Sequence, residues 1–326
     1  MSELLLRRRN LLMKKQEEEL NIRAVCFKAD GEQTVTIKQV NISSAKVFQY
    51  SYDGVTWESW DLSPLPFGGP TKVYIRGYNK ALSYDNTTYE YFSFSTDAYV
   101  YVSGIVESLL DGDNEVLTYG MQGILRQLFY HQTALRSAEN LRFEAQSTLT
   151  NVVSVYALMF QGCTNLLYAP KVLSANNFKG LYCYQYMFDG CTSLITAPEL
   201  PATTLANQCY QYMFRNCTSL ITAPELPATT LADQCYQYMF EGCTSLITAP
   251  ELPATTLAYR CYQYMFEGCT SLKNIRCRAK VKANDATYLW LNGVKTEGTF
   301  YGHSEYGWSS GASGIPSGWE FVELTD

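Results

Sequence analysis

The clearest pattern of apolar and polar positions lies between residues 183 and 272. Here the segment Cys-Tyr-Gln-Tyr-Met-Phe-x-x-Cys-Thr-Ser-Leu occurs four times with a period of 26 residues, beginning at Cys183, Cys209, Cys235 and Cys261. A linker, Ile-Thr-Ala-Pro-Glu-Leu-Pro-Ala-Thr-Thr-Leu-Ala, recurs unchanged at 195–206, 221–232 and 247–258. A fixed period of this length predicts stacked supersecondary units that bury one continuous core.

Each unit is predicted to contain one helix and one extended segment. Cys209, Met213 and Cys217 lie four residues apart, which favours a helix over about Leu205 to Phe214 with Gln211 and Tyr212 pointing outward. The proline of each linker argues against a long regular strand there. Candidate helix N-caps are Thr204, Thr230 and Thr256. One strand and one helix per unit is the build of a leucine-rich repeat.

Two weaker copies extend the array backward. The spacing of apolar residues around Ile124 and Val155 repeats that of the later units, so one phenylalanine column runs through Phe129, Phe160, Phe188, Phe214, Phe240 and Phe266. The sequence therefore predicts a six-repeat solenoid over 107–272. Residues 273–326 break the pattern and are predicted to form a polar C-terminal cap of helix and hairpin pieces, which the open end of a solenoid requires.

The N-terminal third follows different periods. Short β-branched and aromatic runs separated by Gly turns predict a small β-sandwich over 21–106. Leucines spaced for an apolar stripe predict an anchoring helix over 1–20, with its core at 2–20. An isolated helix of that length is marginal in water, so we expect it to pack on a symmetry mate or a larger assembly. The predicted fold class is thus α+β: N-terminal helix, small β-sandwich, then a leucine-rich-repeat α/β solenoid with a C-terminal cap.

The charge and hydropathy of the chain argue against two kinds of partner, nucleic acids and membranes. The net charge of −6 and the isoelectric point near 5.2 argue against nucleic acid, which requires a basic face. No stretch reaches the ~18 apolar residues of a membrane span, so we expect no membrane insertion. The first residues lack the apolar core and cleavage site of a classical signal peptide.

Nine of the eleven cysteines fall in two repeat columns. Their spacing fits no zinc motif, and the two cysteines of one unit are too far apart in the predicted helix for a disulfide. We interpret them as buried thiols that act as small apolar side chains. Disulfides between neighbouring repeats are the alternative.

The repeated frame, with Met-Phe-x-x-Cys-Thr-Ser-Leu at its centre, resembles the bacterial surface-antigen (BspA-like) type of leucine-rich repeat, whose unit reads I-G-x-x-A-F-x-x-C-x-x-L. The resemblance covers Ile124 to Leu272, and the unit here is three residues longer than the family's. The flanks, including Tyr-Ser-Tyr-Asp-Gly-Val-Thr-Trp57 and Trp290-Leu-Asn-Gly-Val294, are similar to proteins of gut bacteria and their phages. The resemblance implies adhesion, receptor or matrix binding, or a virion role, and no catalysis.

Two residue columns are candidate binding sites. Spaced aromatic side chains suit contact with a protein or a sugar, unless they only pack on the next repeat. This column is Tyr186, Tyr212, Tyr238 and Tyr264, with Gln185, Gln211, Gln237 and Gln263 beside it. The second column is Glu199, Glu225 and Glu251, between Lys171 and the pair Arg276 and Arg278. It suits Ca²⁺ or a basic partner, unless it is a solvated face bridged by its cationic ends.

No catalytic motif stands out. The two histidines, His131 and His303, have no nucleophile near them in sequence, and no P-loop, G-x-S-x-G or Rossmann fingerprint occurs. A glycan-active enzyme would need a paired carboxylate cleft that the sequence does not supply. We therefore expect no enzyme, no cofactor and no bound metal.

The expected function is binding or structural. We expect a leucine-rich-repeat module on a phage or prophage virion appendage, at the virion surface, that binds a host-surface protein or glycan. Residues 2–20 are expected to contact other virion or surface proteins and to make a homo-oligomer. The alternative is a bacterial cell-surface adhesin.

Overall fold

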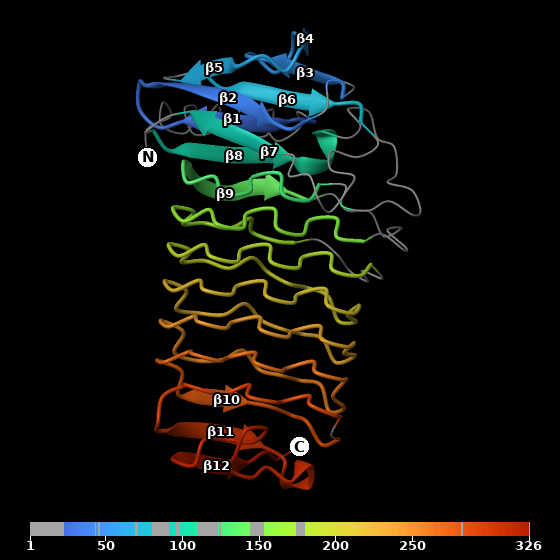
Figure 1. Cartoon of the computed structure of the whole chain (residues 1–326), viewed down its shortest axis with the longest axis vertical. Helices are drawn as coiled ribbons and strands as arrows, with labels where there is room; N and C mark the ends of the chain where they lie inside the picture. Colours follow the sequence, from blue (N-terminus) through green and yellow to red (C-terminus); the bar gives the residue numbers. More distant parts are fainter. Residues whose placement is uncertain are drawn as a thin grey trace, which may run out of the picture.

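The computed structural model is a column, with a β-sandwich at one end and a stack of coils leading to the C-terminal cap (Figure 1). The structure describes residues 23–42, 44, 46–68, 71–79, 91–95, 98–109, 123, 125–143, 153–173, 180–281 and 283–325. The helix predicted over 1–20 lies outside these residues.

The sandwich consists of a six-stranded and a three-stranded sheet. The larger has the order β4-β3-β6-β1-β8-β9, and the smaller has the order β5-β2-β7. The strands are β1 (Val25–Ala29), β2 (Thr34–Val40), β3 (Phe48–Ser51), β4 (Glu58–Trp60), β5 (Leu65–Gly68), β6 (Val73–Gly77), β7 (Tyr91–Ser95), β8 (Val100–Ile105) and β9 (Leu135–Arg142); the 3-10 turn η1 spans Val106–Leu109. Phe27 of β1 and Phe48 of β3 both meet Phe92 of β7, with ring centroids 6.2 Å and 6.0 Å apart, so the two sheets share one aromatic core.

The sandwich and the solenoid are joined through one sheet. β8 pairs in parallel with β9, the first solenoid strand, whereas the described pairs among β1 to β8 are antiparallel. The core is also continuous, because Phe27 packs on Phe129 of the first repeat with centroids 6.2 Å apart. The sandwich therefore covers the N-terminal end of the solenoid, where β8 pairs with the outer edge of β9.

The helix predicted in each repeat is wrong. The structure has no α-helix among its described residues, and the segment that contains Cys209 to Asn216 is a run of consecutive turns. Met213 donates its N–H to Tyr210 O within the same coil (3.2 Å), whereas Tyr212 donates to Gln237 O of the next coil (3.0 Å). This alternation continues along the segment. A helix would have kept these bonds within its own coil, so stacking the coils replaces helical bonds with bonds between repeats.

Left-handed residues make this alternation possible. Gln208, Tyr212 and Asn216 have φ of 57°, 59° and 59°, one in every four residues. The four-residue spacing of Cys209, Met213 and Cys217 is therefore the period of these turns, which resembles the 3.6-residue period of a helix. The predicted N-caps are wrong for the same reason: Thr204 and Thr230 are exposed and form a parallel bridge with each other.

The other side of each coil is extended. Single parallel bridges, such as Thr222 to Thr248, connect neighbouring linkers. After β9, the next regular strands among the described residues lie beyond the last linker proline: β10 (Asn274–Arg276), β11 (Gly298–Gly302) and β12 (Trp319–Glu323). β11 and β12 pair in parallel, so the hairpin predicted for the cap is wrong. The cap instead continues the coil pattern, followed by the 3-10 turn η2 (Ser304–Tyr306).

The solenoid core consists of stacked copies of the same side chains. The phenylalanine column predicted from the sequence is buried, and neighbouring rings from Phe129 to Phe266 stack with centroids 5.3 to 5.6 Å apart. A second buried column contains Tyr156, Tyr184, Tyr210, Tyr236 and Tyr262. All eleven cysteines are buried and none forms a disulfide, which confirms the interpretation of the nine column cysteines as core side chains.

Candidate binding surface

The predicted tyrosine column forms a continuous stack. Neighbouring rings of Tyr186, Tyr212, Tyr238 and Tyr264 lie 4.4, 4.5 and 4.4 Å apart and are within 8° of parallel. Each tyrosine occupies a left-handed turn position, with φ between 57° and 59°, and is half-buried. The rings thus pack on the neighbouring repeats and also keep an exposed edge. We call these four residues the tyrosine stripe.

The glutamines beside the stripe do not point outward as predicted. Gln211, Gln237 and Gln263 are buried, and Gln185 is half-buried. The amide nitrogens of Gln185, Gln211 and Gln237 each donate to the amide oxygen of the next glutamine along the solenoid. A buried amide needs both its donor and its acceptor satisfied, and a stacked copy of itself supplies both. The glutamines therefore couple the repeats and are not available to a ligand.

A row of charged residues lies beside the tyrosine stripe. In the last four repeats, the residue after the phenylalanine is Asp189, Arg215, Glu241 and then Glu267. The Nε and Nη2 atoms of Arg215 each donate to the Asp189 carboxylate at 2.9 Å, and Asp189 is only 5% exposed. The guanidinium carbon lies 4.9 Å from the Tyr212 ring centroid and 5.4 Å from that of Tyr186. We call Asp189, Arg215, Glu241 and Glu267 the charged row.

The sequence interpretation missed the charged row, although a signal was present. In the copies that begin at Cys183, Cys209, Cys235 and Cys261, this position varies in both residue type and charge, while the six residues before it do not change. A variable position in a duplicated core motif indicates a side chain that the core does not constrain. The spacing of residues along the sequence could not show that the side chain at this position would lie beside the tyrosine rings.

The far half of the charged row contains two carboxylates. Glu241 is half-buried, and burial raises the pKa of its carboxyl, with Glu267 raising it further and Arg215 lowering it. Glu267 accepts a hydrogen bond from Asn292 Nδ2 at 2.7 Å. Burial and the nearby Tyr264, Glu241 and Glu267 raise the pKa of Tyr238 to about 12. This end of the surface therefore carries excess negative charge.

The predicted glutamate column lies on the extended linkers, away from the turn segments that carry the tyrosine stripe. Glu199, Glu225 and Glu251 are all exposed. Glu251 forms an ion pair with Arg278, so a cation pairs with the column at its C-terminal end, whereas Lys171 pairs with Glu139, outside the column, at 3.6 Å. Exposed pairs of this kind contribute about 0 to 1 kcal/mol each. Among the described residues, no group of three His, Cys, Asp or Glu side chains is placed to hold a metal ion.

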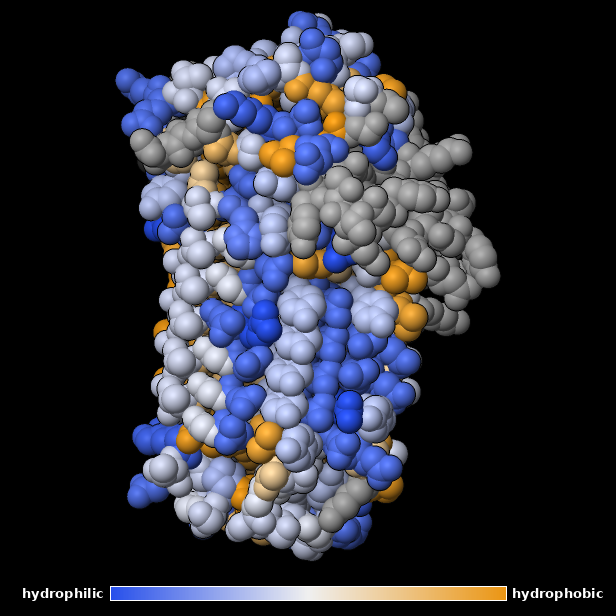
Figure 2. All heavy atoms as spheres, viewed as in Figure 1, coloured by the Kyte–Doolittle hydropathy of each residue, from blue (hydrophilic) through white to orange (hydrophobic). Residues whose placement is uncertain are grey.

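An apolar column accompanies these glutamates. Ile195, Ile221 and Ile247 precede each glutamate by four residues and are 41%, 55% and 43% exposed. On the face shown in Figure 2 the solenoid is mainly hydrophilic, with residues of similar hydropathy aligned in stripes along its axis. Any column of the repeat therefore becomes a linear stripe on the surface.

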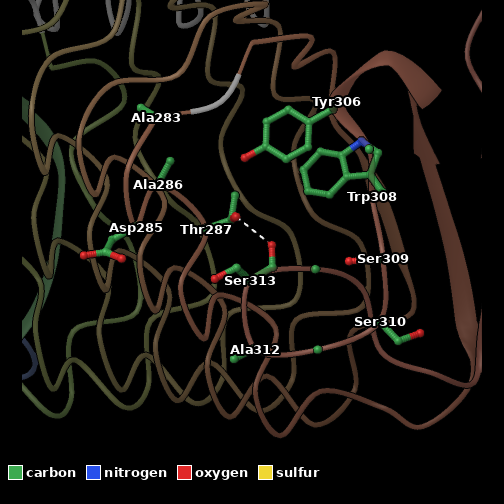
Figure 3. A pocket seen from close by; sticks show the side chains of 13 residues that line it. Ala283, Asp285, Ala286, Thr287, Tyr306, Trp308, Ser309, Ser310, Ala312 and Ser313 are labelled. Carbon is green, nitrogen blue, oxygen red and sulfur yellow. Dashed lines mark hydrogen bonds between the residues drawn. The ribbon is translucent and has the colours of Figure 1, made fainter.

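The cap contains a small pocket of about 230 Å³ (Figure 3). Tyr306 and Trp308 lie on one side of it, and the Thr287 hydroxyl donates to Ser313 O at 2.7 Å within it. Asp285 pairs with Arg260 at 3.5 Å. These groups hold the cap on the last coil, and the pocket has no nucleophile paired with a base. His131 and His303 also lie far apart in the column, in the first repeat and in the cap.

Comparison with known families agrees with the geometry. The family described as the BspA type leucine-rich repeat region matches residues 124–262 and 183–288, in six copies. These matches together span 124–288, which is 165 of the 326 residues. The chain belongs to the BspA-type leucine-rich repeat family. The predicted family is thereby confirmed.

BspA-type repeats are generally non-enzymatic, and they suggest a surface-antigen or protein-binding role. No curated protein and no solved structure matches the chain significantly. Within the described part of this BspA-type protein, no helix is both long and apolar enough to cross a membrane. In its coils, stacked turns occupy the place where helices were expected.

Proposed function

We propose that this BspA-type protein is a non-enzymatic adhesion module whose solenoid binds a protein or glycan on a cell surface. The observation that carries the proposal is the tyrosine stripe. Its rings are held by stacking and by the turn backbone, so little side-chain entropy remains to be lost on binding. Tyrosine at the centre of a surface also supplies both apolar area and a polar hydroxyl.

Two settings fit such a module. In the first, the protein is part of a phage or prophage virion appendage, the solenoid contacts a receptor on the host cell, and residues 1–20 anchor a homo-oligomer. In the second, it is an adhesin on a bacterial cell surface, a setting that the BspA-type repeats favour. The glutamate column then offers a second contact area for the same partner.

Binding is tested with the full chain, fluorescently labelled, on bacterial cells and on animal epithelial cells with their matrix proteins. Replacing Tyr212 and Tyr238 together by Ser is expected to lower cell binding at least about tenfold, as loss of central aromatic contacts does. Tyr78→Ser is the matched control, because Tyr78 is an exposed tyrosine of the sandwich. Equal binding by all three proteins would contradict the proposal.

The setting is tested separately. Antibodies against the chain should label virions if it belongs to an appendage, and intact bacterial cells if it is an adhesin. Light scattering of the chain with and without residues 1–20 tests the anchoring role. A monomer in both cases would contradict oligomerisation through this segment.

A further inference from the structure

The charged row contains a cation that shows which chemistry its surroundings accept. Arg215 comes from one repeat, and Asp189, which it binds through two nitrogen atoms, comes from the preceding repeat. The guanidinium also lies beside Tyr186 and Tyr212, within 5.4 Å of both ring centroids. A carboxylate from one repeat and two stacked tyrosine rings thus form a seat, and a planar guanidinium occupies it.

The same receiving groups occur again further along the solenoid. Glu241 stands in the position of Asp189, and the stacked rings beside it are Tyr238 and Tyr264, 4.4 Å apart. The residue in the position of Arg215 is Glu267, a second carboxylate. Among the described residues, neither glutamate forms a salt bridge, although Arg215 lies within electrostatic range of Glu241. This second seat has two carboxylates and two rings, and its own chain provides no cation in the equivalent position.

We propose that the surface formed by Tyr238, Tyr264, Glu241 and Glu267 binds an exposed arginine side chain of a partner protein. The inference deepens the proposed function by naming the partner chemistry, and it rests on that function. Charge complementarity supports it, because the charged row has three carboxylates and one guanidinium, and the whole chain has a net charge of −6. An incoming guanidinium reproduces the arrangement that Arg215 already makes one repeat earlier.

Arginine fits this seat better than lysine. A guanidinium is planar and presents a fork of N–H donors, so it can bind one carboxylate through two bonds and still lie against aromatic rings. An ammonium group offers a single charged point that is more strongly hydrated. Because the seat is half-buried, binding should weaken as salt screens the charges, but it should remain measurable at physiological ionic strength.

The test is the affinity of the full chain for a short peptide with arginine at alternate positions, measured by calorimetry. Lysine and glutamine versions of the peptide are the ligand controls. The double substitution Glu241→Gln and Glu267→Gln is expected to lower affinity for the arginine peptide at least about tenfold, the usual scale for losing a charge-assisted contact. Glu32→Gln, at an exposed glutamate in the turn between β1 and β2 of the sandwich, is the matched protein control and should bind like the unchanged chain.

A second variant tests whether an arginine of the chain itself can occupy the seat formed by Tyr238, Tyr264, Glu241 and Glu267. Glu267→Arg places a guanidinium one repeat after Glu241, the same separation that joins Arg215 to Asp189. It should abolish binding of the arginine peptide and raise the melting temperature, so loss of binding would not be explained by unfolding. Unchanged peptide binding by this variant would overturn the proposal.

The outcomes separate this inference from the proposed function. If the chain binds cells but binds arginine and glutamine peptides equally, the adhesion role stands and the arginine seat is wrong. If it binds the arginine peptide through Glu241 and Glu267 but binds no cell, the seat stands and the proposed function is wrong. Equal affinity for the arginine and lysine peptides would also contradict the seat, because it would leave only non-specific charge attraction.

Discussion

At the residue scale, the left-handed turn position shapes each coil. Four repeats place glycine at the end of the turn segment, at Gly162, Gly190, Gly242 and Gly268, with φ between 71° and 74°. Asn216 takes this position in one repeat, since asparagine tolerates left-handed backbone better than most residues. The tyrosine stripe uses the same backbone geometry four residues earlier. Its outward direction is therefore a property of the turn and not of side-chain hydropathy.

The first prediction is that the buried thiols make the stability of the protein depend on pH. Burial raises the pKa of Cys163, Cys269 and Cys277 from 9.0 to about 12. A group whose pKa is higher in the folded state stabilises the protein fully only below its unfolded pKa. Stability should therefore fall from about pH 9 towards pH 12, by about 1.4 kcal/mol per pH unit for each such thiol.

Urea unfolding followed by circular dichroism at several pH values measures this slope. The variant Cys269→Ala should be less stable at neutral pH, yet lose less stability between pH 9 and pH 11 than the unchanged chain. Stability that is constant over this range would show that the thiols are accessible in the folded state.

At the element scale, each coil is held to the next by alternate backbone bonds and by the glutamine ladder. Gln237 donates to Gln263 and accepts from Gln211, and Gln234 Nε2 also donates to it at 3.1 Å. The coils therefore depend on their neighbours and have few regular bonds of their own. The sequence of a single unit has the spacing of a helix. In the solenoid, however, alternate backbone bonds of the unit go to the neighbouring coil, so the unit does not form a helix.

The ladder makes a second prediction. Gln237→Met keeps the side chain's length but leaves buried amide groups of Gln211 and Gln263 without partners. It should lower the free energy of unfolding by about 2 to 6 kcal/mol, at about 1 to 3 kcal/mol for each of the two unsatisfied groups. Gln208→Met is the control, because Gln208 is only half-buried, and it should change stability little. Denaturant titration compares the two, and equal effects would show that the ladder contributes no specific stability.

The paired charges make a third prediction. Arg215→Met should destabilise the fold by about 2 to 3 kcal/mol, somewhat less than for a fully buried pair, because it leaves Asp189 buried without its cation. Adding Asp189→Asn should recover part of the loss. Thermal unfolding of both variants tests this, and a double variant less stable than Arg215→Met alone would contradict it.

At the scale of the whole molecule, the solenoid is covered at both ends. The sandwich supplies β8 to the first coil, and the cap supplies β11 to the last strand. Between these ends the near-identical units contact only their neighbours, so stability should be close to a sum over coils and interfaces. The stripe and the row are consequently one extended surface made by duplication.

This additivity makes a fourth prediction. Deleting residues 235–260, one full unit, joins equivalent positions and should give a folded protein shorter by about 4.8 Å, the spacing of neighbouring strands. Deleting half a unit, 235–247, places polar linker residues in the core columns and should prevent folding. Small-angle scattering and circular dichroism distinguish these outcomes, and loss of the fold in the full-unit deletion would show that the coils are not independent.

The sequence by itself determined the repeat period, the phenylalanine and cysteine core columns and the family, because these depend only on spacing and residue type. It misassigned the turn segment, since a four-residue turn period and a 3.6-residue helical period place the same cysteines and methionines on one face. It also pointed the glutamines outward, because only stacking offers an amide the partner that lets it be buried. The tertiary structure alone decided that Arg215 would meet Asp189 beside Tyr212. That contact joins residues 26 positions apart, and it exists because backbone bonds between coils set their register.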